Sequence, residues 1–205
     1  MKKAVNRSIA GFSLLELIVA MTITLLLMAM AGAIFSHSIG TREREMRRTQ
    51  AIVAAQNALS LLSREIANSG YGLTDNGLVI ADSNKQKLHF RSNIENGNTV
   101  TNDVGEDLTY FLDSASEAVV RYDRFDNPQT STVIDRAGGL SFQYWDYTDA
   151  AGNTTSNDTP SANTARIRIS ITVKLEPVQG QPDDQQITYT SDVTLRNSRY
   201  ISRQY

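Results

Sequence analysis

An apolar segment near the N-terminus constrains this chain more than any other feature of its sequence. From Phe12 to Phe35 it reads FSLLELIVAMTITLLLMAMAGAIF, and Glu16 is the only charged residue. The 19 residues from Leu17 to Phe35 contain neither a charge nor a proline. As an α-helix this length covers about 28 Å, which matches the hydrocarbon core of a bilayer. The sequence therefore predicts a spanning helix at residues 12–35, preceded by a short basic leader at residues 1–11.

Three interpretations of this segment compete, and Glu16 bears on all of them. A secretory signal peptide would use Ala29-Met30-Ala31 as its cleavage site, and a simple membrane anchor would not be cleaved. Neither explains Glu16. A carboxylate near the start of an apolar helix costs about 3 kcal/mol in lipid, and such groups usually have a partner. A third interpretation, given next, has to provide a partner for the Glu16 carboxylate.

The sequence from Gly11 to Leu17, GFSLLEL, resembles the processing motif of type IV prepilins and type II secretion pseudopilins. The resemblance implies that prepilin peptidase cuts after Gly11 and N-methylates Phe12, and that Glu16 acts in assembly. Cleavage would create a cationic amine at Phe12, which the Glu16 carboxylate of a neighbouring subunit can neutralise. In a medium of low dielectric constant this pairing is strongly favoured over two isolated charges.

The basic residues around the apolar segment do not decide its orientation. Lys2, Lys3 and Arg7 precede it, but four arginines follow it within residues 41–48. The resemblance implies a single pass through the bacterial inner membrane with a periplasmic head, and later a place in the pilus at the cell surface. We interpret residues 41–48 as a solvated helix face, and contacts with lipid headgroups or with acidic neighbours in a filament remain open.

The helix is expected to continue beyond the apolar segment through residues 36–70. Its apolar residues recur at spacings of three and four and its polar residues occupy the opposite face, which is typical of a helix packed on its own sheet. Asn68-Ser69-Gly70 provides a stop, with Gly70 suited to a left-handed cap. These signals predict one helix over residues 13–68, about 84 Å long. The apolar stripe comprises Ile52, Ala55, Leu59, Leu62 and Ile66.

Residues 71–205 change from a helical to an alternating pattern, which predicts a β-rich head. The clearest strand is Ala165–Leu175, whose apolar residues share one face and whose polar residues share the other. Such strands fit an antiparallel sheet laid on the helix stripe. Polar loops are expected at Asn93–Glu106 and Asp146–Asn163, and a turn at Glu176–Gln186. The other expected strands are Lys87–Arg91, Leu108–Leu112, Ala118–Tyr122, Leu140–Trp145, Ile187–Tyr189 and Val193–Leu195.

The end of the helix and two strand segments resemble PilW-like minor pilins, and are similar to the J-type minor pseudopilins of type II secretion. The segments are Leu62–Gly72, Arg166–Ile169 and Val193–Asn197. The resemblance implies an α+β, type IV pilin-like fold and a minor subunit located at or near the pilus tip. It implies as partners prepilin peptidase, other minor pilins, the major pilin, the inner-membrane assembly platform and, before extraction, membrane lipid. A type II secretion pseudopilin and a membrane-anchored adhesin are the alternatives.

Composition and motifs argue against catalysis and cofactors. The chain has no cysteine, so it has no disulfide or thiolate metal site, and its net charge of −2 indicates no nucleic-acid partner. His37 and His89 lie in no triad or metal-spaced pattern, and we interpret His89 as a hydrogen-bonded strand residue. Asp149, Asn153, Asn157 and Asp158 carry oxygen donors, but their spacing does not match an EF-hand and is ordinary for turns. We therefore expect neither enzyme activity nor a cofactor.

Overall fold

The computed structural model describes residues 12–95, 100–147, 152–177 and 184–202. The chain divides into two compact units, Met1–Glu45 and Met46–Tyr205. Helix α1, Leu14–Ala67, contributes its N-terminal part to the first unit and its C-terminal part to the second.

Helix α1 agrees with the predicted helix to within one residue at each end. Its first backbone bond runs from the Leu17 N–H to the Ser13 carbonyl at 3.1 Å. After Ala67 the chain leaves the helix, and Gly70 adopts a left-handed conformation with φ of +76°. Alanine at Gly70 would be strained there, because L-residues with a Cβ atom avoid this region. The predicted stop signal is confirmed.

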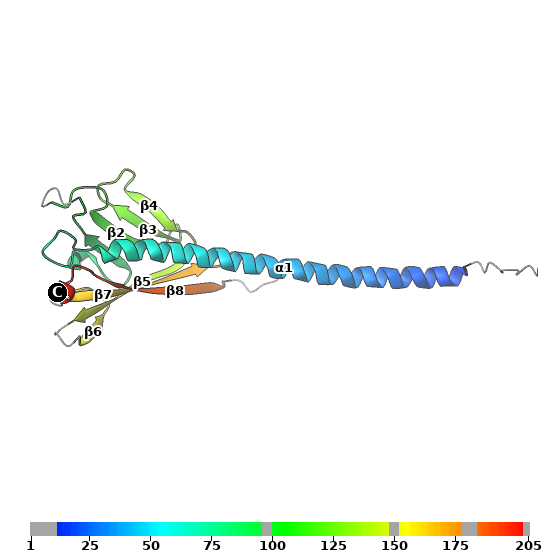
Figure 1. Cartoon of the computed structure of the whole chain (residues 1–205). Helices are drawn as coiled ribbons and strands as arrows, with labels where there is room; N and C mark the ends of the chain where they lie inside the picture. The colour runs from blue at the N-terminus through cyan, green and yellow to red at the C-terminus, as the bar shows by residue number, and fades with distance from the viewer. Residues whose placement is uncertain (1–11, 96–99, 148–151, 178–183, 203–205) are drawn as a thin grey trace, which may run out of the picture. The chain divides into compact units, whose positions relative to one another are not determined.

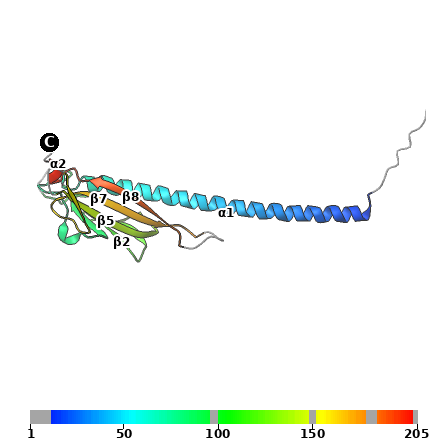
Figure 2. The ribbon, with the colours of Figure 1, turned by 90° about the horizontal axis from the view of Figure 1, so that it is seen from below.

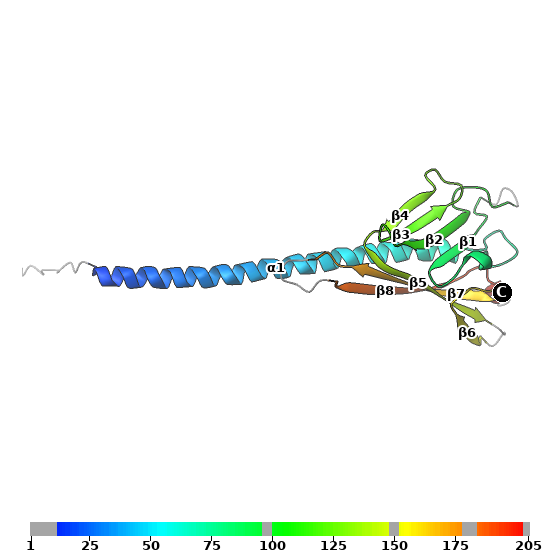
Figure 3. The same ribbon diagram turned by 180° about the vertical axis from the view of Figure 1, so that it is seen from behind.

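The second unit contains two four-stranded antiparallel sheets. The first has the order β1-β2-β3-β4 and the second the order β6-β5-β7-β8. In the view of Figure 1, β2, β3 and β4 are drawn above the C-terminal part of α1 and β5 to β8 below it, and Figure 3 shows β1 beside β2 from behind. The strands are β1 Lys87–Arg91, β2 Asp107–Asp113, β3 Ala118–Asp123, β4 Thr130–Ile134, β5 Ala137–Tyr147, β6 Thr154–Asn157, β7 Thr164–Lys174 and β8 Gln186–Thr194; a 3-10 turn η1 covers Ile80–Asp82 and a short helix α2 covers Arg199–Ser202.

The strand predictions are confirmed in their main features and incomplete at the sheet edges. β7 pairs with β5 on one side and with β8 on the other, as its alternating pattern indicated. β4 was not expected, and β6 lies within the predicted loop Asp146–Asn163. Both are short and mostly exposed, so neither carries the apolar alternation that marks a half-buried strand. Of the predicted turn Glu176–Gln186, residues 178–183 lie outside the described residues.

One core joins the helix to both sheets. The stripe residues Ala55, Leu59, Leu62 and Ile66 are buried, together with Ala58, while Ile52 is half-buried. They pack with the inner faces of the strands in a single apolar cluster that includes Leu88, Tyr110, Phe142 and Ile169. Figure 2 shows β8, β7, β5 and β2 following one another away from α1. The predicted packing of the helix stripe on the head is therefore confirmed.

A polar network crosses the boundary between α1 and the first sheet. Arg121 on β3 donates from Nε to Glu65 Oε2 on α1 at 3.1 Å, and the Tyr110 hydroxyl on β2 donates to the same oxygen. Arg121 also pairs with Asp123 at 3.3 Å. Burial lowers the pKa of Arg121, but the neighbouring Glu65, Tyr110 and Asp123 outweigh it and the pKa rises. Arg121 therefore stays charged, and the network holds helix and sheet in one register.

Because two tyrosines are buried, we expect the head to lose stability at alkaline pH. Burial raises the pKa of Tyr110, with Glu65 adding to the effect, and burial alone raises the pKa of Tyr144 above the ordinary value of 10.0. The folded-state pKa values are higher than the unfolded ones, so keeping these two tyrosines neutral stabilises the fold fully below pH 10. Above pH 10 each tyrosine lowers the free energy of unfolding by up to about 1.4 kcal/mol per pH unit. Urea unfolding followed by circular dichroism at pH 8, 10 and 11 measures the loss. In Tyr144→Phe the decline above pH 10 should be shallower, and an identical decline would contradict this assignment.

Candidate functional site

The processing motif lies at the start of α1. Gly11 is outside the described residues, whereas Phe12 is 85% exposed and precedes the helix. Glu16 lies in the first turn. At this end the helix dipole is positive, and the dipole stabilises a carboxylate. A free amine at Phe12 would place a second positive charge at this end of the helix.

The apolar segment of α1 presents its whole surface. None of its most apolar 18-residue window is buried, and this helix is the one in the described residues that is long and apolar enough to cross a membrane. Its two threonines are satisfied within the helix, since Thr22 Oγ1 donates to the Val19 carbonyl at 2.9 Å and Thr24 Oγ1 to the Ala20 carbonyl at 2.8 Å. Internal satisfaction of this kind is what lipid or a bundle of apolar helices demands. The exposed apolar residues include Leu17, Ile18, Met21, Ile23, Leu25, Leu26, Leu27, Met28, Met30, Ile34 and Phe35.

The arginine-rich residues 41–48 are not uniformly solvated. Arg47 forms an ion pair with Glu176, which follows β7. Glu176 also accepts a hydrogen bond from Arg136 at 2.6 Å. Arg47 therefore contacts the head of its own chain, while Arg42 and Arg48 are exposed as expected for a solvated helix face.

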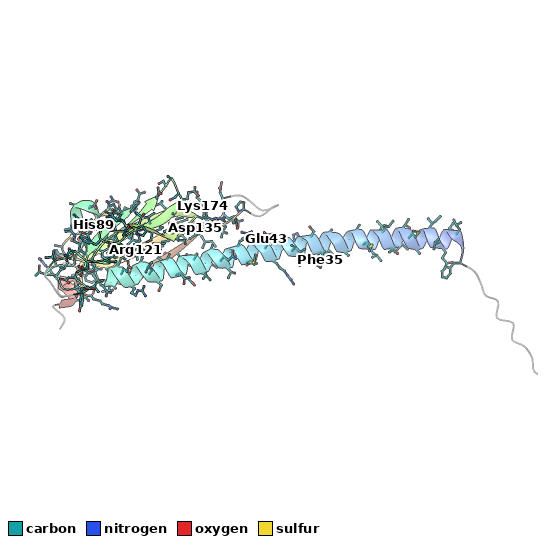
Figure 4. All side chains as sticks on the ribbon, turned by 90° about the horizontal axis from the view of Figure 1, so that it is seen from above. Phe35, Glu43, His89, Arg121, Asp135 and Lys174 are labelled. Atoms are coloured by element: carbon teal, nitrogen blue, oxygen red, sulfur yellow. The ribbon has the colours of Figure 1, made fainter. Side chains whose placement is uncertain are left out.

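His89 belongs to a charged cluster that the sequence did not indicate. Its Nδ1 lies 2.8 Å from Asp82 Oδ2 on η1, and its Nε2 lies 2.6 Å from Asp107 Oδ1 on β2. The expectation that His89 is a hydrogen-bonded strand residue is confirmed. Its partners were not predictable, because Asp82 and Asp107 reach it only through the β1–β2 pairing and the 3-10 turn. Figure 4 labels His89 on the head, farther from α1 than Arg121.

The loop Asp146–Asn163 uses some of its oxygen donors for its own structure. Asn157 donates from Nδ2 to Asp146 Oδ2 at 3.0 Å, and the Thr164 hydroxyl donates to Asp146 Oδ1 at 2.6 Å. Asp149 lies outside the described residues. Across the parts of the chain that the structure describes, no group of three or more His, Cys, Asp or Glu side chains is arranged to hold a metal ion.

Comparison with known proteins bears on the N-terminal segment. The family described as "Prokaryotic N-terminal methylation motif" matches residues 6–32, which include Gly11, Phe12 and Glu16. No curated protein and no solved structure matches the chain. The matched motif and the exposed apolar helix together support a type IV pilin-like or pseudopilin subunit and are consistent with membrane anchoring.

Proposed function

We propose that this chain is a minor type IV pilin, a structural subunit and not an enzyme, incorporated at or near the pilus tip to prime assembly. Residues 1–11 are the leader, and prepilin peptidase removes it after Gly11 and methylates Phe12. Residues 12–35 hold the subunit in the inner membrane and later form the filament core. Residues 36–70 continue the helix beneath the head, residues 71–205. The observation that carries the proposal is a single carboxylate, Glu16, at the start of an exposed apolar helix segment and within residues 6–32, which match the methylation motif.

Extraction from the bilayer exchanges lipid contacts for contacts between apolar helices. Lipid tails and apolar helices are equally apolar, so this exchange alone hardly favours the filament over the bilayer. The pairing of Glu16 with the Phe12 amine supplies that preference. In lipid the Glu16 carboxylate and the Phe12 amine are costly, and in a filament the carboxylate of one subunit neutralises the amine of the next.

Mass spectrometry of the mature N-terminus tests the processing step. We expect the first residue to be an N-methylated Phe12. A chain that begins at Gly32 would identify a signal peptide cleaved after Ala31, and a chain that begins at Met1 would identify an uncleaved anchor. Either result overturns the proposal.

Glu16→Ala tests the assembly step. The variant should insert into the membrane as the parent does, because the apolar segment is unchanged, but its incorporation into filaments should fall at least about tenfold, since the neighbouring amine is left unpaired. Immunoblots of membrane and sheared-filament fractions measure both quantities. Glu95→Gln, an exposed acid on the head, is the control and should incorporate normally. Normal incorporation of Glu16→Ala would refute the role of Glu16.

A J-type minor pseudopilin of type II secretion is the second candidate, because the same N-terminal motif supports it. The two systems differ in the machine that extracts the subunit. Loss of the chain's own gene should reduce surface pili if it is a minor pilin, and should reduce secretion of folded periplasmic proteins if it is a pseudopilin.

A further inference from the structure

The outer face of the first sheet carries a recess of about 570 Å³ above the centre of β1 and β2. The strand register accounts for its composition. His89 lies opposite Thr109, and Thr109 lies opposite Tyr122, so one row crosses three strands. Lys87 lies opposite Phe111 in the next row. The recess therefore combines aromatic rings from β2 and β3 with charged groups from β1.

The charged floor of this recess is fixed in place. The His89 ring lies between two carboxylates, with Nδ1 2.8 Å from Asp82 Oδ2 and Nε2 2.6 Å from Asp107 Oδ1. Asp107 is only 4% exposed at its side chain and also accepts from Arg91 Nε at 3.0 Å. The Asp107 charge is thus compensated within the protein and is not available to repel an anion.

The open rim of the recess is cationic. Among the described residues, Lys87 pairs with Asp82, and both Arg91 beside the recess and Arg124 within it pair with Asp107, so three cations meet two carboxylates. Arg124 is the most accessible of the cations, with a side chain that is 59% exposed and lies 3.8 Å from Asp107. At that distance it keeps donors free for a ligand, and a guanidinium binds a carboxylate with two parallel hydrogen bonds.

The remaining groups favour a hydroxylated ring over a peptide. Phe111 and Tyr122 offer apolar ring surface. Asp82, 46% exposed at its side chain, is an acceptor at the edge of the recess. A sugar acid has an apolar ring face, hydroxyl donors for Asp82 and a carboxylate for Arg124. A glutamate peptide would also offer a carboxylate to Arg124, but it has neither hydroxyl donors for Asp82 nor a ring face for Phe111 and Tyr122.

We propose that this recess is a binding site for an acidic saccharide whose sugar-acid carboxylate is held by Arg124. The sugar ring lies against Phe111 and Tyr122, and Asp82 accepts hydrogen bonds from the hydroxyl groups of the sugar. The site is independent of the proposed assembly function, because it uses the outer face of the head and not α1. Its biological role does rest on the proposed function: on a subunit at the cell surface, the site would attach the cell to polysaccharides that contain uronic acids.

Isothermal titration calorimetry on the full chain in detergent micelles tests the proposal. Trigalacturonate is the ligand, neutral galactotriose is the control ligand, and a tri-glutamate peptide tests the alternative class. We expect trigalacturonate to bind and neither galactotriose nor tri-glutamate to compete with it. Absence of trigalacturonate binding at millimolar concentration overturns the proposal, as does equal binding of tri-glutamate or of galactotriose.

Two variants locate the site. Arg124→Gln should weaken trigalacturonate binding at least about tenfold, because it removes a charge-assisted bidentate contact. Phe111→Ala should weaken it by loss of ring contact. The matched control is Arg136→Gln, an exposed arginine paired with Glu176 on another part of the head, which should leave binding unchanged. Unchanged binding in Arg124→Gln, or equal loss in Arg136→Gln, overturns the assignment. Arg124→Gln should unfold at the parent's temperature, so that a loss of binding is read as loss of the contact.

Discussion

Replacing Gly77 by alanine is expected to destabilise the head by about 4 kcal/mol, which lowers the unfolding temperature by about 10 °C for a chain of this size. Gly77 has a φ of +72°, and a Cβ atom there would lie 2.2 Å from the Gly70 nitrogen and 2.3 Å from the Arg91 carbonyl oxygen. Those two atoms form a hydrogen bond of 2.9 Å, and the Arg91 N–H donates to the Gly77 carbonyl at 2.7 Å. The new methyl group would separate the end of α1 from β1, and neither backbone can move independently.

Gly105→Ala is the matched control for this prediction. Gly105 also has a positive φ, +88°, but a Cβ atom there would meet only Ile94 Cδ1, at 3.9 Å. This variant should cost about 1 kcal/mol, the penalty of the left-handed backbone alone. Thermal unfolding followed by circular dichroism compares the two. If Gly77→Ala costs no more than Gly105→Ala, the close approach of the two backbones is not what requires glycine.

The sequence predicted elements wherever one strong local signal decides them. Helix α1 has an uninterrupted apolar segment, a stripe with helical spacing and a glycine stop, and its bounds agree with Leu14–Ala67. β7 alternates along its entire length and was predicted almost to the residue. β6 consists of threonine, serine and asparagine and forms because it pairs with β5. The division into two sheets depends likewise on which strands pair, and no local pattern encodes pairing.

The candidate sites divide in the same way. The processing motif is a contiguous run, so its residues could be identified directly. The cluster around His89 is assembled from three elements, and Asp107 comes from the strand beyond the loop Asn93–Glu106. A lone histidine on a strand gives no indication that two carboxylates will enclose it. Such clusters follow from the register of the sheet, which requires the fold to be known.

The second large effect is expected at Glu65, where α1 meets the first sheet. Glu65→Ala should destabilise the head by about 3 kcal/mol, because it leaves the Arg121 guanidinium and the Tyr110 hydroxyl without their shared acceptor. The Arg121 side chain is only 16% exposed, so water cannot fully replace the carboxylate. Urea unfolding at pH 7 measures the change. The exposed pair Arg168–Asp192 is the contrast, since both side chains reach solvent and Asp192→Ala should have little effect.

We expect Glu65→Ala to lose stability mainly because Arg121 and Tyr110 are left buried without an acceptor, and less because the bonds to Glu65 are lost. A triple variant separates these two contributions. Glu65→Met, Tyr110→Phe and Arg121→Met together replace the three groups by apolar side chains of similar size. A buried charge pair is expensive to form, so removing all of its members costs less than removing one. Asp123 retains the backbone donors of Gly105 at 2.8 Å and Phe125 at 3.2 Å when Arg121 is gone. We therefore expect the triple variant to be more stable than Glu65→Ala. If the triple variant is instead less stable than Glu65→Ala, the hydrogen bonds and ion pairs of the network stabilise the fold by more than the desolvation of its charged groups costs.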